Sequence, residues 1–320
     1  MIEATDIRTI AVIGTGAIGA SWAALALARG FGVIAADPAP GAEQALRDTV
    51  ATRLTELSDP GRGDPGRGEP ARRERLSFTG DTREAAAAAD LVLENGPERL
   101  EVKREIFAAL DQAARPDVLL ASSSSGLPPS SFQDACARHP ERVLVAHPFN
   151  PPHLVPLVEI VGGRLTSEQA VESALEVFRH LGKRPIRIRG ERPGHVANRL
   201  QAALWREAYY LVGEGVVSVQ DIDTAISAGP GLRWALLGPF ATQHLSGGGG
   251  GLEHVLEHLG PPMVDWWHDL GAPELTPELI AALVAGVREE LAGDDENDLM
   301  ARRDLALREL MATKKRLGLD

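Results

Sequence analysis

The sequence of 320 residues predicts an α/β fold: a doubly wound, mostly parallel sheet followed by an all-helical C-terminal domain. Over roughly the first 190 residues, short apolar runs rich in β-branched residues alternate with helical stretches, which is typical of parallel strands joined by crossover helices. After residue 193 the apolar residues recur at helical spacing, and no strand pattern returns. We therefore place a domain boundary near residues 190–193, with domains at 1–190 and 191–320.

The same patterns give the expected elements in order. Strands are expected at residues 9–13, 32–36, 75–78, 90–94, 118–121, 142–146, 157–161 and 185–189. A helix is expected from the glycine-rich turn after the first strand to Arg29. Further helices are expected at 41–57, 196–211, 219–227, 252–259, 277–291 and 297–315. Residues 59–70 are dense in proline and glycine, which predicts a mobile surface loop. The five glycines at 247–251 are expected to form a flexible linker between helices.

A glycine-rich turn follows the first strand, with the sequence Gly14-Thr15-Gly16-Ala17-Ile18-Gly19. Gly14 permits the turn, Gly16 has no Cβ to keep a pyrophosphate away, and Gly19 allows close packing of the helix on the strand. The helix N-terminus then faces the phosphates. Asp37 ends the second strand about 20 residues further on, where a carboxylate can bind the ribose hydroxyls. The first domain is therefore interpreted as a Rossmann-type dinucleotide-binding domain.

Asp37 also distinguishes between two cofactors. Its negative charge would repel a 2′-phosphate, and Pro38-Ala39-Pro40 after it offers no arginine to accept one. The sequence therefore favours NAD over NADP. A nicotinamide cofactor implies hydride transfer, and removal of hydride from an alcohol requires a base that takes the hydroxyl proton.

The segment His147-Pro148-Phe149-Asn150-Pro151 and the following strand, which carries Glu159, provide a candidate base. A histidine titrates near neutral pH, and a carboxylate on its other ring nitrogen fixes the tautomer and stabilises the imidazolium. The alternative is that the two side chains are bystanders near a sheet edge. The predicted NAD site favours proton transfer, because it gives His147 a proton to accept.

Composition excludes several other classes of protein. The formal net charge of −12 disfavours nucleic acid and anionic membranes as main partners. Cys136 is the one cysteine, so an internal disulfide is excluded, and a structural role is expected for it. No apolar run is long enough to span a bilayer, and the N-terminus lacks a signal-peptide pattern, so a cytoplasmic location is expected. No metal site is predicted.

These motifs, together with Pro193-Gly194-His195-Val196-Ala197-Asn198-Arg199-Leu200, resemble the 3-hydroxyacyl-CoA dehydrogenase family across nearly the whole chain. The resemblance implies NAD-dependent interconversion of a 3-hydroxy and a 3-keto group. It implies a catalytic site formed by Ser125, His147, Glu159 and Asn198, with Glu98, Lys103, Ser125 and Asn150 also near the cofactor. Pro148 and His195 depart from the family pattern, which usually has aromatic residues there, a phenylalanine at the second position.

The C-terminal half resembles one branch of this family, which contains L-carnitine dehydrogenase, λ-crystallin and L-gulonate 3-dehydrogenase. The similarity lies in the pair Arg233-Trp234 and in the continuation of the chain past residue 300. It implies a small 3-hydroxy acid, carnitine-like or gulonate-like, as substrate. Arg233 is the candidate clamp for a free carboxylate, the alternative being an arginine paired with a structural acid.

The helical domain is also rich in aromatic residues, which could hold a quaternary ammonium group or pack in a core or dimer interface: Trp205, Tyr209, Tyr210, Trp234, Trp266 and Trp267. Two other functions stay open. An L-3-hydroxyacyl-CoA dehydrogenase could bind the phosphates of CoA through arginines at positions 53, 62, 67, 72, 73 and 75. A catalytically silent, crystallin-like structural or binding protein would keep the fold without turnover. A homodimer formed through the helical domain is expected from the resemblance.

Overall fold

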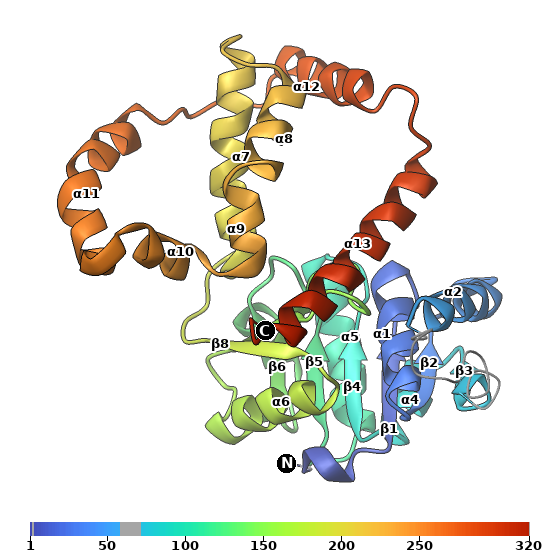
Figure 1. Ribbon diagram of the computed structural model, residues 1–320. Helices are drawn as coiled ribbons and strands as arrows, with labels where there is room; N and C mark the ends of the chain where they lie inside the picture. The colour runs from blue at the N-terminus through green and yellow to red at the C-terminus, as the bar shows by residue number, and fades with distance from the viewer. Residues whose placement is uncertain (2, 58–71, 320) are drawn as a thin grey trace. The chain divides into compact units, whose positions relative to one another are not determined.

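The computed structural model describes residues 1, 3–57 and 72–319 of the chain (Figure 1). The chain divides into two compact units, Met1–Arg199 and Leu200–Asp320. The first unit contains the sheet, and the second is built from helices. The loop predicted at residues 59–70 lies outside the described residues.

The first unit holds an eight-stranded sheet in the order β3-β2-β1-β4-β5-β6-β7-β8. The strands are β1 Thr9–Ile13, β2 Gly32–Ala36, β3 Leu76–Thr79, β4 Leu91–Glu94, β5 Leu119–Ser122, β6 Val143–Pro148, β7 Leu157–Gly162 and β8 Arg184–Ile188. Strands β1 to β6 pair in parallel, whereas β7 runs antiparallel to β6. Residues 149–156 between β6 and β7 contain no helix, and a short connection of this kind reverses the chain. The predicted doubly wound, mostly parallel fold is confirmed.

Helices cover both faces of the sheet (Figure 1). They are α1 Ala17–Ala28, α2 Ala42–Leu57, α4 Thr82–Ala87, α5 Leu100–Ala113 and α6 Glu168–His180. Strand residues alternate between two cores, since Ile10 and Val12 share one with α1, α2 and α6. Ala11 and Ile13 share the other with α4 and α5. This alternation is the two-residue period of a strand buried on both faces.

Short 3₁₀ helices complete the first unit: η1 Ala4–Asp6, η3 Pro129–Ser131, η4 Gln133–Ala135 and η5 Pro140–Arg142. Cys136 follows η4, is buried, and donates through its Sγ to the Phe107 carbonyl at 3.4 Å. Burial raises the pKa of this thiol to about 12, so it stays protonated at neutral pH. These contacts fit the structural role expected for Cys136.

The described residues of the second unit form helices joined by short connections and contain no strand. The unit contains the last residues of α7 Ala197–Gly213, and then α8 Val219–Ser227, α9 Pro230–Leu236, α10 Pro239–Ser246, η6 Gly248–Gly250, α11 Gly251–Asp269, α12 Pro277–Glu290 and α13 Glu296–Arg316. The linker predicted at residues 247–251 is wrong, because these glycines form a 3₁₀ turn and begin α11. Gly248 and Gly251 have positive φ angles of 55° and 59°, which a residue without a Cβ adopts readily.

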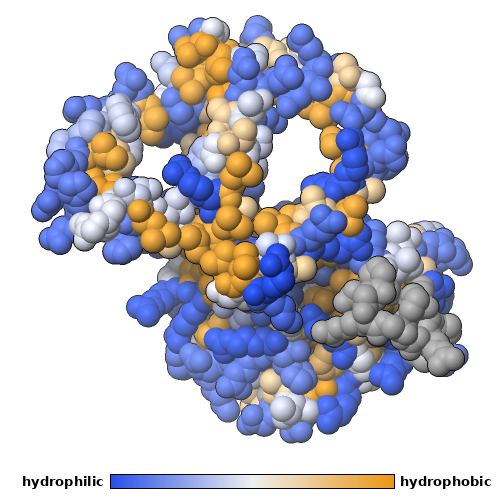
Figure 2. Space-filling view, in the orientation of Figure 1, coloured by the Kyte–Doolittle hydropathy of each residue, from blue (hydrophilic) through white to orange (hydrophobic). Residues whose placement is uncertain are grey.

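Apolar side chains lie exposed over the helical unit (Figure 2). Phe240 is 74% exposed, and Trp266 and Trp267 are 60% and 63% exposed. Most helices of this unit bury no residue at all. None of the described helices combines the length and the apolar character that a membrane crossing would need.

Candidate active site

The glycine turn after β1 has the geometry of a phosphate-binding loop. Gly14 has a φ of 83°, and a Cβ at Gly19 would lie 1.9 Å from the Gly14 carbonyl oxygen. A Cβ at Gly16, in contrast, would meet nothing within 4 Å, so the backbone faces open space there. No side chain caps the N-terminus of α1 at Gly16, whereas Ser167 caps α6 through Ala170 N. The first N–H groups of α1 are thus available to an anion, which fits the pyrophosphate of a dinucleotide.

Asp37 closes this turn from the end of β2. Its Oδ2 accepts hydrogen bonds from Thr15 N at 2.8 Å and Thr15 Oγ1 at 3.1 Å, and its Oδ1 accepts one from Ala39 N at 2.9 Å. A carboxylate has about four lone-pair positions, so one on Oδ1 is open to a ribose hydroxyl. A second ribose contact would require the Thr15 hydroxyl to turn away.

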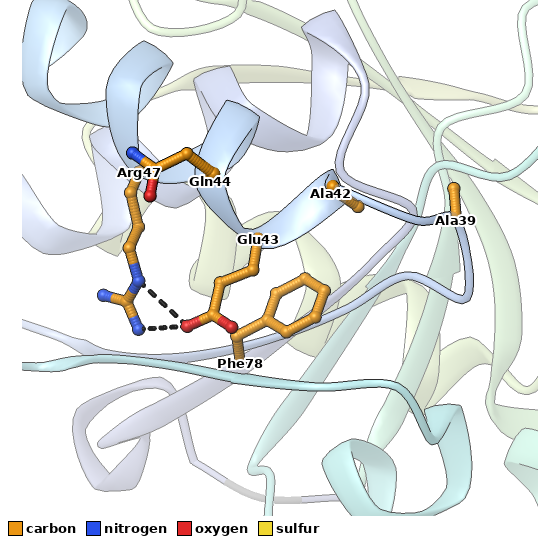
Figure 3. A pocket seen from close by; sticks show the side chains of 7 residues that line it. Ala39, Ala42, Glu43, Gln44, Arg47 and Phe78 are labelled. Carbon is orange, nitrogen blue, oxygen red and sulfur yellow. Dashed lines mark hydrogen bonds and ion pairs between the residues drawn. The ribbon is translucent and has the colours of Figure 1, made fainter.

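A hollow of about 550 Å³ is lined in part by the segment that follows Asp37 (Figure 3). It is lined by residues of the segment after Asp37, of α2 and of β3: Ala39, Gly41, Ala42, Glu43, Gln44, Arg47 and Phe78. Arg47 donates to Glu43 Oε1 at 2.7 and 3.0 Å. The guanidinium at this hollow is therefore already paired with a carboxylate.

A buried ionic cluster supports the ends of β4 and β5. Glu94 is fully buried and accepts hydrogen bonds from Lys103 Nζ, with 2.9 Å to each carboxylate oxygen, and from Ser122 Oγ at 2.6 Å. Lys103 is 1% exposed and also donates to the Gly96 carbonyl at 3.1 Å. The ammonium of Lys103 is thus directed at the loop after β4. Direct contact between Lys103 and the cofactor stays a prediction.

Glu98 lies at the edge of this cluster, with one carboxylate oxygen 3.8 Å from Lys103 Nζ. It accepts hydrogen bonds from Ser124 Oγ at 2.6 Å and Gly126 N at 2.9 Å. Burial raises the pKa of Glu98, but these hydrogen bonds and the nearby ammonium outweigh burial and hold the pKa below its ordinary value. Glu98 therefore fixes the turn after β5 as an ionised carboxylate.

Sequence reasoning missed two residues that build this region, Glu94 and Asn95. Asn95 Oδ1 accepts from Ser123 Oγ at 2.8 Å, and Ser123 Oγ accepts from Trp22 Nε1 at 3.1 Å. Both missed residues end an otherwise apolar run, where parallel strands deliver side chains to a ligand crevice. Their place at the carboxyl end of a predicted strand is the feature by which the sequence could have identified them.

His147 and Glu159 face each other directly across the antiparallel pair β6 and β7. His147 Nδ1 lies 2.8 Å from Glu159 Oε2, and the two residues are 4% and 0% exposed. A carboxylate accepts, so Nδ1 carries the proton and Nε2 presents its lone pair. The sequence-predicted pair is thus brought together in the geometry that a general base requires.

The second oxygen of Glu159 is also engaged. Glu159 Oε1 accepts from the backbone N–H groups of Val196 and Ala197, each at 3.0 Å, at the start of α7. Burial raises the pKa of Glu159, but the hydrogen bonds from His147, Ala197 and Val196 outweigh burial and hold it below the ordinary value. Glu159 is therefore a carboxylate at neutral pH.

The remaining predicted catalytic residues join the same region. Asn198 Nδ2 donates to the Ser125 carbonyl at 3.1 Å, and Ser125 itself is exposed. Asn150, the proposed cofactor neighbour, lies two residues after the end of β6 and is also exposed. Arg233 and Trp234 belong to α9 in the second unit, where Trp234 is 44% exposed. Their part in substrate binding stays a prediction.

A phosphate-binding turn at β1 and a buried, carboxylate-held histidine at β6, on one Rossmann sheet, define a nicotinamide-dependent dehydrogenase. The chain belongs to the 3-hydroxyacyl-CoA dehydrogenase family. Residues 9–191 match the family model for the NAD binding domain, and residues 194–288 match the model for the C-terminal domain.

Individual relatives are similar over almost the whole chain. An L-carnitine dehydrogenase of Pseudomonas sp is 46% identical over 314 residues, which cover 97% of this chain and 96% of that protein. A 3-hydroxyacyl-CoA dehydrogenase of Gibberella moniliformis is 46% identical and covers 98% and 97%. The solved structure of 5-formyl-3-hydroxy-2-methylpyridine 4-carboxylic acid 5-dehydrogenase, an NAD⁺-dependent dismutase, has a TM-score of 0.78 at 30% identity, covering 98% and 99%. The chain is accordingly an NAD-dependent oxidoreductase that acts on 3-hydroxy acids.

Proposed function

We propose that this enzyme oxidises the 3-hydroxyl of L-carnitine, or of a closely similar small 3-hydroxy acid, with NAD. The observation that carries the proposal is the near-full-length similarity to L-carnitine dehydrogenases, which recurs at 46% identity for the enzyme of Streptomyces coelicolor over 99% of this chain. The geometry around His147 supports the reaction class.

In the proposed mechanism His147 is the general base. Its Nε2 accepts the proton of the substrate hydroxyl, while Glu159 holds Nδ1–H and stabilises the imidazolium that forms. Ser125 and Asn198, joined at 3.1 Å through the Ser125 carbonyl, hold the substrate oxygen. NAD, when bound, accepts the hydride from the substrate carbon.

Cofactor choice follows from the charges around Asp37. The carboxylate of Asp37 and the pairing of Arg47 with Glu43 both disfavour a 2′-phosphate at the adenosine end. We place Glu98, Ser125 and Asn150 near the nicotinamide end. Lys103 stabilises the loop at that end through its hydrogen bonds to Glu94 and Gly96.

We assign the substrate carboxylate to Arg233. Among the described residues this guanidinium forms no ion pair, which supports a free clamp over the alternative of a structural pair. A planar guanidinium can hold a carboxylate through two parallel hydrogen bonds. Arg233→Met is expected to raise the KM for free hydroxy acids by about tenfold or more, measured by steady-state kinetics. An unchanged KM for every free acid would contradict the assignment.

The rest of the helical domain, residues 191–320, is proposed to complete the substrate site and to form a homodimer. Trp234 and the other aromatic residues of this domain are candidates for contact with a quaternary ammonium group. A cytoplasmic location remains our expectation.

The CoA alternative has less support from the arginines that it would use. Arg53 pairs with Glu56 at 3.1 Å, and Arg75 donates to the Gly30 carbonyl. Arg62 and Arg67 lie outside the described residues. The similarity to the Gibberella moniliformis protein keeps this alternative worth testing.

A substrate panel tests the proposal. NADH formation is followed with L-carnitine, L-gulonate, 3-hydroxybutyrate and 3-hydroxybutyryl-CoA. We expect the highest kcat/KM with L-carnitine. A preference for 3-hydroxybutyryl-CoA would establish the CoA enzyme instead, and no turnover with any compound would support the catalytically silent alternative.

A further inference from the structure

His195 is a buried histidine that the mechanism above leaves without a role. It is 1% exposed and stands where the family resemblance has a phenylalanine. Its φ of 52° lies in the left-handed region, next to Gly194 with a φ of 74°. Histidine is one of the few residues other than glycine that are enriched in this region. The backbone here directs the imidazole into the protein.

The ring makes one specific hydrogen bond. His195 Nε2 lies 3.0 Å from the Ser124 carbonyl oxygen. A carbonyl can only accept, so Nε2 carries the proton and donates. Nδ1 is then an unprotonated acceptor in the neutral ring, and it is buried with no hydrogen-bond partner in the described part of the chain.

The surrounding groups keep this ring neutral. Burial lowers the pKa of His195, and the charge of His147, whose ring centroid is 5.3 Å away, lowers it further. The hydrogen bond to Ser124 and the carboxylates of Glu159 and Glu98 act in the opposite direction but do not overcome burial. The neutral ring therefore donates through Nε2 at neutral pH without placing a positive charge beside the base.

His195 and the start of α7 together bind two successive backbone carbonyls. His195 takes the Ser124 carbonyl, and Asn198 takes that of Ser125 at 3.1 Å. Between these side chains, the N–H groups of Val196 and Ala197 bind Glu159 Oε1. This segment thus connects the serine turn to the carboxylate that orients the base.

We propose that His195 is a positioning residue of the proton-transfer site, whose Nε2–H holds the Ser124 carbonyl and so fixes Ser125 beside Asn198. It touches no reacting atom and acts through the serine turn. A phenylalanine at this position could fill the space but could not donate. The inference rests on the proposed function of Ser125 and Asn198 and adds a tether through a residue that departs from the family pattern.

Three substitutions distinguish the role of Nε2 from that of Nδ1. His195→Gln keeps a donor near the position of Nε2, His195→Asn keeps a polar group near the position of Nδ1 only, and His195→Phe removes both. We expect His195→Asn and His195→Phe to lower kcat by about tenfold or more, because small misplacements of positioning groups are costly in rate. His195→Gln should recover most of the loss. The Kd for NADH, measured by fluorescence, should stay unchanged in all three.

Recovery by His195→Asn but not by His195→Gln would overturn the proposal, because the function would then reside at Nδ1. Equal loss in all three variants with equally lowered melting temperatures would also count against it, as a role in folding alone predicts that pattern.

A second measurement uses the wild-type protein and does not depend on turnover. ¹⁵N NMR of histidine-labelled enzyme should show His195 neutral and protonated at Nε2 at about pH 7 to 8, above the ordinary histidine pKa of about 6.5. Protonation at Nδ1 would overturn the tether. Because this readout is independent of substrate, a wild-type enzyme that fails the substrate panel would reject the proposed function and leave the tether to be judged separately.

Discussion

Both carboxylate oxygens of Glu159 accept hydrogen bonds in the candidate active site. Oε2 accepts from His147 Nδ1, and Oε1 accepts from two backbone N–H groups. All three partners are donors, so only a group with two accepting oxygens satisfies them together. The residue therefore joins the base to the start of α7 as well as orienting the imidazole.

Glu159→Gln tests this double role. The amide has one accepting oxygen, so its NH₂ group must face either His147 Nδ1–H or the N–H groups of Val196 and Ala197. We expect kcat to fall by about 10²-fold, the acid limb of the pH–rate profile to move to lower pH, and the melting temperature to drop. The acid limb moves because the imidazolium loses its counter-charge. A profile that superimposes on that of the wild type would contradict the role of Glu159.

The sequence predicted the chemistry of single residues better than their contacts. A histidine and a glutamate on neighbouring strands suggested a pair, but their direct opposition depends on the antiparallel register of β6 and β7. Lys103 was expected at the cofactor, yet its contacts are with Glu94 and Gly96. Such partners depend on tertiary packing, which a local pattern does not encode.

The connection between β6 and β7 is held by Lys183, which lies between α6 and β8. Lys183 Nζ donates to the carbonyls of Pro152 and Val155 and lies 5.1 Å from the Trp22 ring centroid. Burial, followed by the charge of Arg29, lowers the pKa of Lys183 to about 7. This connection follows directly from His147, so its order matters to the base.

The shifted pKa of Lys183 gives a pH dependence of stability. The folded pKa lies below the unfolded value of 10.5, so between pH 7 and 10 the unfolded chain binds more protons and stability rises with pH. We expect a rise of up to about 1 kcal/mol per pH unit in denaturant unfolding, present in the wild type and absent in Lys183→Met. Measurements at or below about pH 8 keep ionisation of Cys136 in the unfolded chain small, because the ordinary pKa of the thiol is 9.0.

Lys315→Met is a suitable control, because Lys315 is exposed on α13 and should leave the pH dependence intact. Equal slopes for the wild type and Lys183→Met would show that Lys183 is charged in the folded protein.

The predicted boundaries of helices and strands agree with the structure where a single sequence pattern determines the element. The β-branched runs of β1 and β2 were predicted to the residue, and α8 likewise. The short helices α9 and α10 were missed, because each begins at the proline of a Gly-Pro pair, a pair that suggests irregular chain. Proline is in fact favoured at the first position of a helix, where its missing N–H would have no partner.

The helical unit exposes several large apolar side chains to solvent. Leu200, Phe240 and Leu245 are 64%, 74% and 66% exposed. Helices that leave such residues in water are unusual in a monomer, and a symmetric homodimer is the simplest arrangement that buries them.

We predict that light scattering after size exclusion gives twice the chain mass of 34.1 kDa across a wide range of protein concentrations. A mass of one chain throughout that range would contradict the dimer. The aromatic residues of this unit would then be more readily assigned to substrate.

The most direct test of the central claim is the effect of His147→Gln on turnover. With NAD and the substrate that the wild type oxidises fastest, the account predicts a fall in kcat of about 10²–10⁴-fold, while the Kd for NADH stays unchanged. Near-normal turnover would contradict the claim that His147, held by Glu159, is the base of this dehydrogenase.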